Sequence, residues 1–342
     1  MDIIGLDLHK RESQLSIKAQ DGALTDRRIV TSRERFTTVL GQRPRARILL
    51  EASTESEWVA RHLEALGHEV LVADPNYAPM YATRSRRTKT DKRDARTLRE
   101  ACETGTYRLA HRLSEARRHV RADLAVRDAL VRTRTRYVAL MKTLVRRDGL
   151  RVPASESEHV PARVLALELA PLVAISAPLN AQIAAADQRL AALAQHDPIV
   201  ALLATVPGIG PVTASAVVAT VDDITRFPSA HQLEAYFGVV PSEQSSGEKR
   251  RIGRITKAGN RRVRWLLVEA AWRILRSRSP ATAALRAWTL TIAQRRGKRI
   301  AVVALARRLA GILYAMWRDG VSYDPRKIRS PRREPVHASE RT

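Results

Sequence analysis

The sequence predicts an α/β domain followed by a mostly helical region. Over residues 1–113, short apolar segments bounded by turn residues alternate with amphipathic segments, which is typical of strands and helices in one layered domain. Residues 114–148 contain no proline or glycine and repeat apolar residues every seven positions, which predicts one long helix. Beyond residue 198 the apolar spacing is again helical, apart from a basic segment with glycines at 241–260.

The first domain is predicted to open with three strands in succession. A buried strand is expected over residues 2–9 (DIIGLDLH), followed by strands over 14–20 (QLSIKAQ) and 24–30 (LTDRRIV). Asp21-Gly22 separates the last two, and Asp-Gly between two strand-like runs is a strong signal for a β-hairpin turn.

Helices and strands then alternate. A helix is predicted over residues 33–40, a strand over 45–52, a helix over 55–66 and a strand over 68–75, with one more helix to follow. Three consecutive strands that are continued by parallel strands through helical crossovers form the ribonuclease-H-like arrangement. This is the fold that we predict for residues 1–113.

A helical connector is predicted over residues 114–197. Arginines cover much of the surface of its long helix, either as a solvated face or as a contact surface for nucleic acid. After a boundary at Pro153 and Pro161, apolar residues follow the four-three spacing of a coiled-coil seam, which also suits an intramolecular helical hairpin. The residues of this seam are Leu179, Ile183, Ala186, Leu190 and Leu193.

The last domain is predicted over residues 198–320, followed by a basic, disordered tail over 321–342. PGIGP (207–211) lies between two helical stretches and resembles the turn of a helix-hairpin-helix module. Its Gly208 and Gly210 would let backbone amides approach a phosphate at the start of the next helix. A plain helical hairpin that needs glycine at a tight turn is the alternative.

The charge of the chain indicates its partners. The net charge is +25 and the pI is about 11.3, so nucleic acid is the expected partner and an anionic membrane surface the alternative. Cys102 is the only cysteine, which excludes internal disulfides and cysteine-based zinc sites. No signal peptide is recognised, and Arg307 and Arg308 interrupt the longest apolar run. We therefore expect no membrane segment, but a cytoplasmic protein associated with the nucleoid.

Four carboxylates are candidate metal ligands. Asp7 lies in the first strand and Glu51 at the end of the fourth, while Asp91 and Asp94 are spaced i, i+3 on one face of the next helix. A ribonuclease-H-like topology makes these elements neighbours, and hard cations such as Mg²⁺ or Mn²⁺ bind carboxylate oxygens. Two such ions can stabilise both the attacking and the leaving oxygen of a phosphoryl transfer.

Simpler explanations exist for each carboxylate taken alone. The aspartates within RSRRTKTDKRDAR (84–96) can neutralise their basic neighbours, and Asp7 can be a strand-end residue. Asp7 is the strongest indication of a metal site, because an unpaired carboxylate inside an apolar strand is costly to bury. Glu55 and Glu57 compete with Glu51, but they fall in the first turn of a helix, where acidic residues are favoured anyway.

Two segments carry the residues expected to contact nucleic acid. The first surrounds the carboxylates. The second is SSGEKRRIGRITKAGNRR (245–262), which leads into a helix and is typical of a phosphate-binding loop. Besides Gly208 and Gly210, the predicted contact residues are Lys10, Lys89, Lys92, Arg93, Arg254, Lys257, Asn260, Arg261 and Arg262.

Five motifs, in the same order along the chain, resemble those of the insertion-sequence transposases related to the Piv invertases. They are GLDLHK (5–10), LLEAS (49–53), KTDKRDA (89–95), PGIGP (207–211) and SG…GRITKAGN…R (246–262). The resemblance implies a RuvC-like DEDD domain and a carboxyl-terminal domain with a catalytic serine. The DEDD carboxylates would be Asp7, Glu51, Asp91 and Asp94.

The same resemblance implies how the protein works. The position directly before Gly247 makes Ser246 the nucleophile, with the adjacent Ser245 as the alternative. Donor and target DNA would be the substrates, a structured bridge RNA the guide, and dimers that assemble into a synaptic tetramer the active form. A serine–phosphate ester conserves the energy of the phosphodiester, so a strand hydroxyl can reverse the step and reseal the DNA.

We therefore predict a metal-dependent DNA transposase, or site-specific recombinase, that cleaves and rejoins strands through a phosphoserine intermediate. A RuvC-like junction nuclease that uses the four carboxylates alone is the first alternative, and it would cleave DNA without Ser246. A non-catalytic nucleic-acid-binding protein is the second, and it would bind DNA without metal-dependent cleavage.

Overall fold

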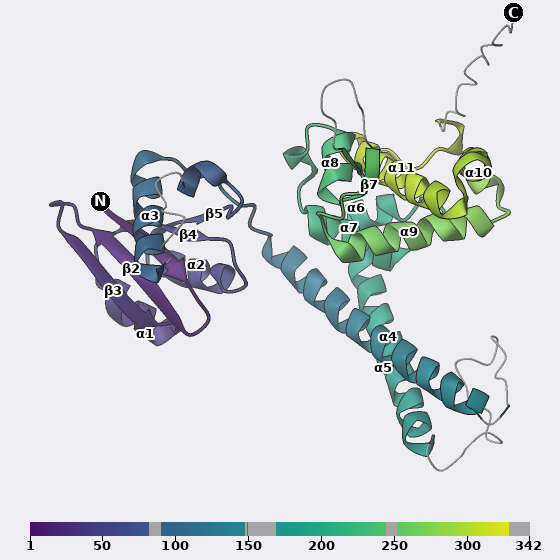
Figure 1. Ribbon diagram of the computed structural model, residues 1–342, viewed down its shortest axis with the longest axis horizontal. Helices are drawn as coiled ribbons and strands as arrows, with labels where there is room; N and C mark the ends of the chain where they lie inside the picture. Colours follow the sequence, from purple (N-terminus) through teal and green to yellow (C-terminus); the bar gives the residue numbers. More distant parts are fainter. Residues whose placement is uncertain (82–89, 148, 150–168, 244–251, 328–342) are drawn as a thin grey trace, which may run out of the picture. The chain divides into compact units, whose positions relative to one another are not determined.

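The computed structural model describes the chain in five segments (Figure 1), namely residues 1–81, 90–147, 149, 169–243 and 252–327. Two compact units make up the chain: unit 1 is Met1–Arg112 and unit 2 is Leu113–Thr342.

Unit 1 contains a mixed five-stranded sheet with the order β3-β2-β1-β4-β5. Its first three strands are antiparallel neighbours, whereas β4 and β5 continue the sheet parallel to β1. The element order predicted from the sequence is therefore confirmed, including the hairpin turn, where Gly22 has a φ of +89°. The strands are β1 (Asp2–Leu8), β2 (Glu12–Lys18), β3 (Leu24–Val30), β4 (Ala46–Glu51) and β5 (Glu69–Ala73).

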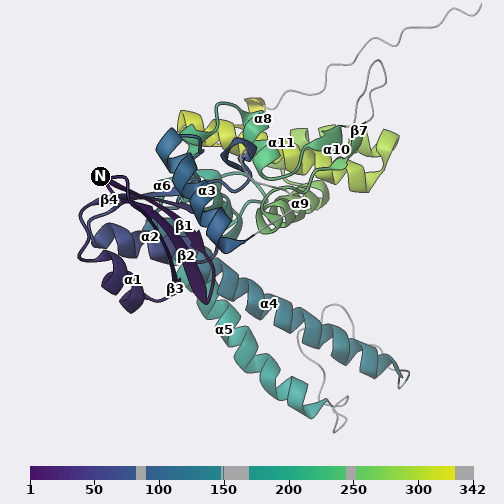
Figure 2. The ribbon, with the colours of Figure 1, turned by 60° about the vertical axis from the view of Figure 1, so that its left-hand side comes forward.

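Helices cover both faces of this sheet (Figure 2), with α1 (Arg33–Leu40) and α2 (Ser56–Ala65) on one face and α3 (Asp91–Thr104) on the other. Ile4 and Leu6 of β1 and Ile48 and Leu50 of β4 belong to the core formed with α1 and α2, whereas Leu49 packs in the core formed with α3. Because side chains alternate along a strand, Asp7 and Glu51 lie on the α3 face.

Gly5 of β1 lets α3 lie directly on the sheet. A Cβ atom at this position would be 2.0 Å from Ala95 O and 2.3 Å from Arg99 N, both in the backbone of α3. Since no side chain fits between them, the two backbones are in contact, and α3 is held close to the end of β1 that carries Asp7.

Unit 2 begins with two long helices that pack side by side, α4 (Glu115–Arg147) and α5 (Ala170–Gln195). The helix predicted over 114–148 is confirmed, because α4 begins one residue later and ends one residue earlier than predicted. The α5 helix packs on α4 of the same chain, as the intramolecular alternative required, and Arg127 pairs with Asp187 across them. The seam prediction was wrong at Leu193, which is 43% exposed. The buried side chains of α5 are Leu179, Ile183, Ala186, Leu190 and Ala194.

The remainder of unit 2 is mostly helical, with one small sheet that the sequence did not predict. In this sheet β6 (Pro241–Glu243) pairs antiparallel with β7 (Ile252–Ile255). The helices are α6 (Pro198–Leu203), α7 (Pro211–Val221), α8 (Ala230–Tyr236), α9 (Arg261–Arg276), α10 (Ala283–Arg296) and α11 (Lys298–Asp319). Short 3₁₀ helices are η1 (Ala78–Tyr81) in unit 1 and η4 (Ile224–Arg226), η5 (Pro280–Thr282) and η6 (Pro325–Lys327) in unit 2.

The α11 helix is long and apolar enough to cross a membrane, but it is packed as a core helix of unit 2. Leu305, Leu309 and Leu313 are fully buried in that core. Its two central arginines have partners within the unit: Arg307 Nε lies 2.6 Å from a carboxylate oxygen of Glu234, and the Arg308 guanidinium lies over the ring of Trp288. These contacts fit a soluble core helix better than a helix surrounded by lipid.

Candidate active site

Asp7 is the buried centre of a group of carboxylates in unit 1. It is only 8% exposed, and the pKa of its carboxyl is raised from 3.8 to about 6, mainly by burial. The His9 imidazole opposes this rise in pKa, while the negative charges of Asp94, Asp91 and Glu51 contribute to it. The four carboxylates predicted from the sequence are thus close enough to affect one another, although they come from β1, β4 and α3.

His9 is a member of this group that the sequence reasoning missed. Its Nε2 atom lies 3.2 Å from Asp7 Oδ2 and 3.5 Å from Asp91 Oδ1. One donor atom each from Asp7, His9 and Asp91 lie within 4.8 Å of one another. The signal was present in the sequence, because residues i and i+2 of an extended strand point to the same face.

Asp91 and Asp94 lie in the first turn of α3, which is capped by Thr90. The Thr90 side chain accepts a hydrogen bond from Arg93 N, and both Asp91 and Asp94 fall in the first turn, where negative charge is favoured by the helix dipole. Asp94 is buried and Asp91 is exposed. One aspartate is therefore turned toward the sheet and the other stays accessible to a ligand.

Glu51 is held by a tyrosine. The Tyr81 hydroxyl, at the end of η1, donates a hydrogen bond of 2.5 Å to Glu51 Oε1. Such contacts orient a carboxylate before it binds a cation.

The two competing glutamates have other partners. Glu55 accepts a hydrogen bond of 2.6 Å from the indole of Trp58. Glu57 lies 2.8 Å from Arg61 and 3.0 Å from Arg112. Of the three candidates near the end of β4, Glu51 is the one that contributes to the electrostatic field at Asp7.

The donor set fits a hard divalent cation. Asp7 Oδ2 is buried and accepts no hydrogen bond from the described residues. Several carboxylates in one place repel one another, and a bound cation would remove both this repulsion and the cost of burying the Asp7 charge. The donors are mostly carboxylate oxygens, which suits Mg²⁺ or Mn²⁺ better than a soft metal.

Binding of Mn²⁺ at this cluster is expected to weaken below about pH 6, because a protonated carboxyl does not bind a cation. The pKa of Asp7 is raised to about 6, so its ligand form is complete above that pH and is lost as the pH falls through it. Affinity measured by electron paramagnetic resonance should drop roughly tenfold between about pH 7 and about pH 5. A constant affinity over this range would show that Asp7 is not a ligand.

Tyr81→Phe is expected to weaken Mn²⁺ binding roughly tenfold, since loss of a group that orients a ligand typically has this effect. The change removes the hydroxyl that donates to Glu51 and keeps the ring. Tyr77→Phe is the matched control, because the Tyr77 ring packs against the Arg108 guanidinium and this contact does not need the hydroxyl. Equal Mn²⁺ affinities for the two variants would show that Tyr81 does not contribute to the metal site.

The basic residues predicted around the carboxylates have different surroundings. Lys10 and Arg93 are exposed and accessible to a polyanion. Lys92 is also exposed, but its ammonium lies 3.3 Å from Asp26 Oδ2. Lys89 lies outside the described residues.

The glycines of PGIGP have a structural explanation. Gly208 has a φ of +87°, and a Cβ atom there would lie 3.1 Å from the Ile274 side chain and 3.2 Å from Ala270 O, both in α9. Gly210 is the N-cap residue of α7, whose residues from Thr213 onward are all buried. The plain tight turn accounts for Gly208, and the binding of phosphate by either glycine stays a prediction.

Two predicted contact residues at the start of α9, Asn260 and Arg262, make structural contacts within unit 2. Asn260 caps the helix through Arg262 N and Val263 N. Arg262 donates to the carbonyl of Leu124 in α4, its Nη2 atom lies 3.3 Å from Asp128, and burial lowers its pKa. Arg262 thus joins α9 to α4, a role that its sequence position did not reveal.

The remaining predicted contact residues are accessible. Arg254, Lys257 and Arg261 are exposed, and Lys257 has a φ of +55°, which is unusual for a residue with a side chain. Ser245 and Ser246 follow β6 in the sequence and lie outside the described residues.

Two family profiles match the chain. Residues 4–147, which include all four carboxylates, match a profile described as "Transposase", of the IS110 DEDD type. Residues 200–286, which include Ser246, match a profile described as "Transposase IS116/IS110/IS902 family".

Several curated proteins are similar over nearly the whole length. The chain is 30% identical over 337 residues to the "Probable family 20 transposase" of Pseudomonas aeruginosa, which covers 94% of this chain and 98% of the relative. It is 28% identical over 328 residues to the "Transposase for insertion sequence element IS1111A" of Coxiella burnetii, with 92% and 89% covered. It is 26% identical over 332 residues to the "Transposase for insertion sequence element IS1328" of Yersinia enterocolitica, with 94% and 98% covered.

Proposed function

The chain belongs to the IS110/IS116/IS902 family of transposases, and from this premise we propose that it cleaves and rejoins DNA with four carboxylates and one serine. Its function is DNA transposition by recombination. The carboxylates are Asp7, Glu51, Asp91 and Asp94, and the nucleophile is Ser246.

The observation that carries the proposal is the burial of Asp7 among other carboxylates. A chain with a net charge of +25 has many arginines available to neutralise an aspartate, yet within the described part of the chain the charged groups that act on Asp7 are three carboxylates and one imidazole. Such an arrangement raises the energy of the metal-free protein, and it is typical of a site that is completed by a cation.

A Mg²⁺ or Mn²⁺ ion held by these carboxylates would stabilise negative charge on the oxygens of the scissile phosphate. Asp7 would act as the buried, fixed ligand, because its strand is packed between two layers of helices. Asp91, which is exposed, would be the ligand nearest to the incoming DNA. Tyr81 would keep Glu51 in its binding orientation.

The serine supplies the covalent step. The Ser246 hydroxyl oxygen forms a bond to phosphorus, the bond from phosphorus to one strand oxygen breaks, and the departing oxygen takes up a proton as the serine loses one. The phosphodiester becomes a phosphoserine ester of similar energy, so attack by the hydroxyl of another strand restores the DNA and the serine. This chemistry requires Ser246 and the carboxylates, from one copy or two, to reach the same phosphate.

Donor and target DNA are the substrates, and we propose a structured guide RNA from the element as a further partner. In this arrangement base pairing reads the sequence while the basic protein holds the backbones. Dimers that assemble into a tetramer would bring four DNA ends together. The protein would work in the cytoplasm, at the nucleoid.

The proposal is tested by a search for a covalent intermediate. The protein is incubated with Mg²⁺, end-labelled DNA that carries the element junction, and transcript from the element's flanks. We expect a protein–DNA adduct that survives denaturation and depends on the metal, and omission of the transcript tests the guide separately. Cleaved DNA without any adduct would favour the nuclease, and bound but uncleaved DNA would favour the non-catalytic protein.

A further inference from the structure

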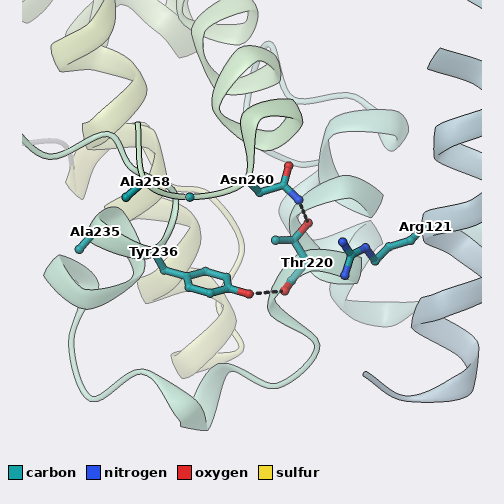
Figure 3. Close-up of a pocket in the computed structure, with 7 residues that line it drawn as sticks. Arg121, Thr220, Ala235, Tyr236, Ala258 and Asn260 are labelled. Carbon is teal, nitrogen blue, oxygen red and sulfur yellow. Dashed lines mark hydrogen bonds between the residues drawn. The ribbon is translucent and has the colours of Figure 1, made fainter. Parts of the chain in front are cut away.

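A hollow of about 390 Å³ opens between α4, α7 and α8 in unit 2. Its lining residues include Arg121, Thr220, Tyr236 and Asn260. Figure 3 shows that the side chains of Arg121, Tyr236 and Asn260 point toward Thr220. The Tyr236 hydroxyl donates to Thr220 O at 3.5 Å, and Asn260 Nδ2 donates to Thr220 Oγ1 at 3.4 Å. The ring and the amide are therefore held at the edge of the hollow.

A second hollow, of about 800 Å³, lies between α4 and the first turns of α9. Asn260 lines both hollows, so the two adjoin. Arg132 and Arg136 of α4 and Trp265 of α9 are on the wall of the larger one. From Arg121 to Arg136 the α4 helix advances about 22 Å, enough to follow several nucleotides of an extended strand.

The two hollows hold the only exposed aromatic side chains of the chain. Its five Trp, seven Tyr and three Phe all fall within the described segments, and of these only Tyr236 (39%) and Trp265 (52%) are exposed. Large rings are usually buried, so an exposed ring beside a hollow is a candidate contact for a flat apolar ligand. The coincidence of both rings with adjoining hollows indicates one binding surface.

Positive charge surrounds these rings. Arg121, Arg132, Arg136 and Arg261 are exposed around the two hollows. Asp128, the one carboxylate among the described lining residues, is already paired with Arg132 and with the half-buried Arg262. The surface therefore has an excess of guanidinium groups, which form forked contacts with phosphate.

We propose that the two hollows form one track for an unpaired stretch of DNA strand, with bases stacked on Tyr236 and Trp265 and phosphates paired with the surrounding arginines. Rings and cations that alternate along a groove are the usual platform for a single strand, because stacking needs a base face that a duplex does not expose. The inference rests on the proposed function, since strands that are cleaved and rejoined must be unpaired for part of the reaction.

The test measures binding of labelled oligo-dT to the full chain in EDTA, so that neither metal nor cleavage is involved. Trp265→Ala is expected to weaken binding roughly 5- to 150-fold, the range for loss of one stacked base, and Trp265→Phe to restore most of it. Duplex binding should change less than threefold. Leu290→Ala removes another exposed apolar side chain and serves as the matched control. Ultraviolet cross-linking of a bromodeoxyuridine strand should modify the peptides that carry Tyr236 or Trp265.

Four results would overturn the track. They are an equal loss of duplex binding, no rescue by phenylalanine, cross-links outside both peptides, or oligo-dT binding that Trp265→Ala leaves unchanged. A Trp265 effect seen with oligo-rU but not with oligo-dT would assign the surface to RNA instead. If the Trp265 variants behave as expected but the protein never cleaves DNA, the single-strand track is supported and only the proposed cleavage chemistry is wrong.

Discussion

Asp7→Asn is expected to abolish DNA cleavage and, at the same time, to stabilise the metal-free protein. Loss of a central ligand removes several kcal/mol of charge stabilisation, so cleavage should fall on the order of a thousandfold or more. The folded-state pKa of Asp7, about 6, lies above the ordinary value of 3.8. Its ionisation therefore destabilises unit 1 increasingly between these two pH values and fully above them. Asparagine removes this cost, which is up to about 3 kcal/mol.

Hydrogen exchange of unit 1 peptides in EDTA near neutral pH measures the stability, and cleavage of labelled DNA with Mg²⁺ measures the activity. Asp26→Asn is the matched control on the same face of the sheet. Asp26 lies 2.6 Å from Arg96 and 3.3 Å from Lys92, so its loss should destabilise unit 1 slightly and leave cleavage intact. If Asp7→Asn destabilises unit 1 as Asp26→Asn does, Asp7 is a structural aspartate and the metal site is refuted.

Ser246→Ala is expected to eliminate the covalent adduct and to reduce strand exchange on the order of 10⁴-fold or more, because no other group would replace the attacking hydroxyl. DNA binding should be unchanged, since one hydroxyl contributes little beside many arginines. Gel analysis of denatured reactions detects the adduct, and peptide mapping of the wild-type adduct identifies the modified serine.

Ser245→Ala is the matched control for the nucleophile. It alters the neighbouring hydroxyl and should keep the adduct and at least a substantial part of the activity. An adduct that persists in Ser246→Ala and vanishes in Ser245→Ala would move the nucleophile by one residue. Cleavage products that are unchanged in both variants would establish a hydrolytic nuclease in place of a recombinase.

Local patterns were sufficient to predict most of unit 1. Each strand and helix there has its own apolar period and its own turn or cap, such as Gly22 at the hairpin and Thr90 before α3. The position of Asp7 and Glu51 on one face follows from the alternation of strand residues. For this reason the convergence of the carboxylates could be predicted before any contact was known.

Other features depend on contacts between distant residues, and the sequence did not reveal them. Tyr81 meets Glu51 across 30 positions, and Arg262 meets Leu124 across 138. Heptad spacing assigned Leu193 to the seam, but Ala194 is buried in its place, because a straight helix has 3.6 residues per turn and drifts from a strict heptad. The pairing of β6 with β7 joins two strands of three and four residues, too short for a periodic signal.

The contact between Gly5 and the backbone of α3 has a consequence for attempts to re-engineer the enzyme. The separation of the first strand from the helix that bears two of the acidic groups is fixed by main-chain atoms in van der Waals contact. It cannot be narrowed by repacking a neighbouring residue, and a side chain at position 5 would force the two elements apart. A change of preferred ion would therefore have to come from exchanging the liganding groups themselves, within a frame whose dimensions are set by the polypeptide.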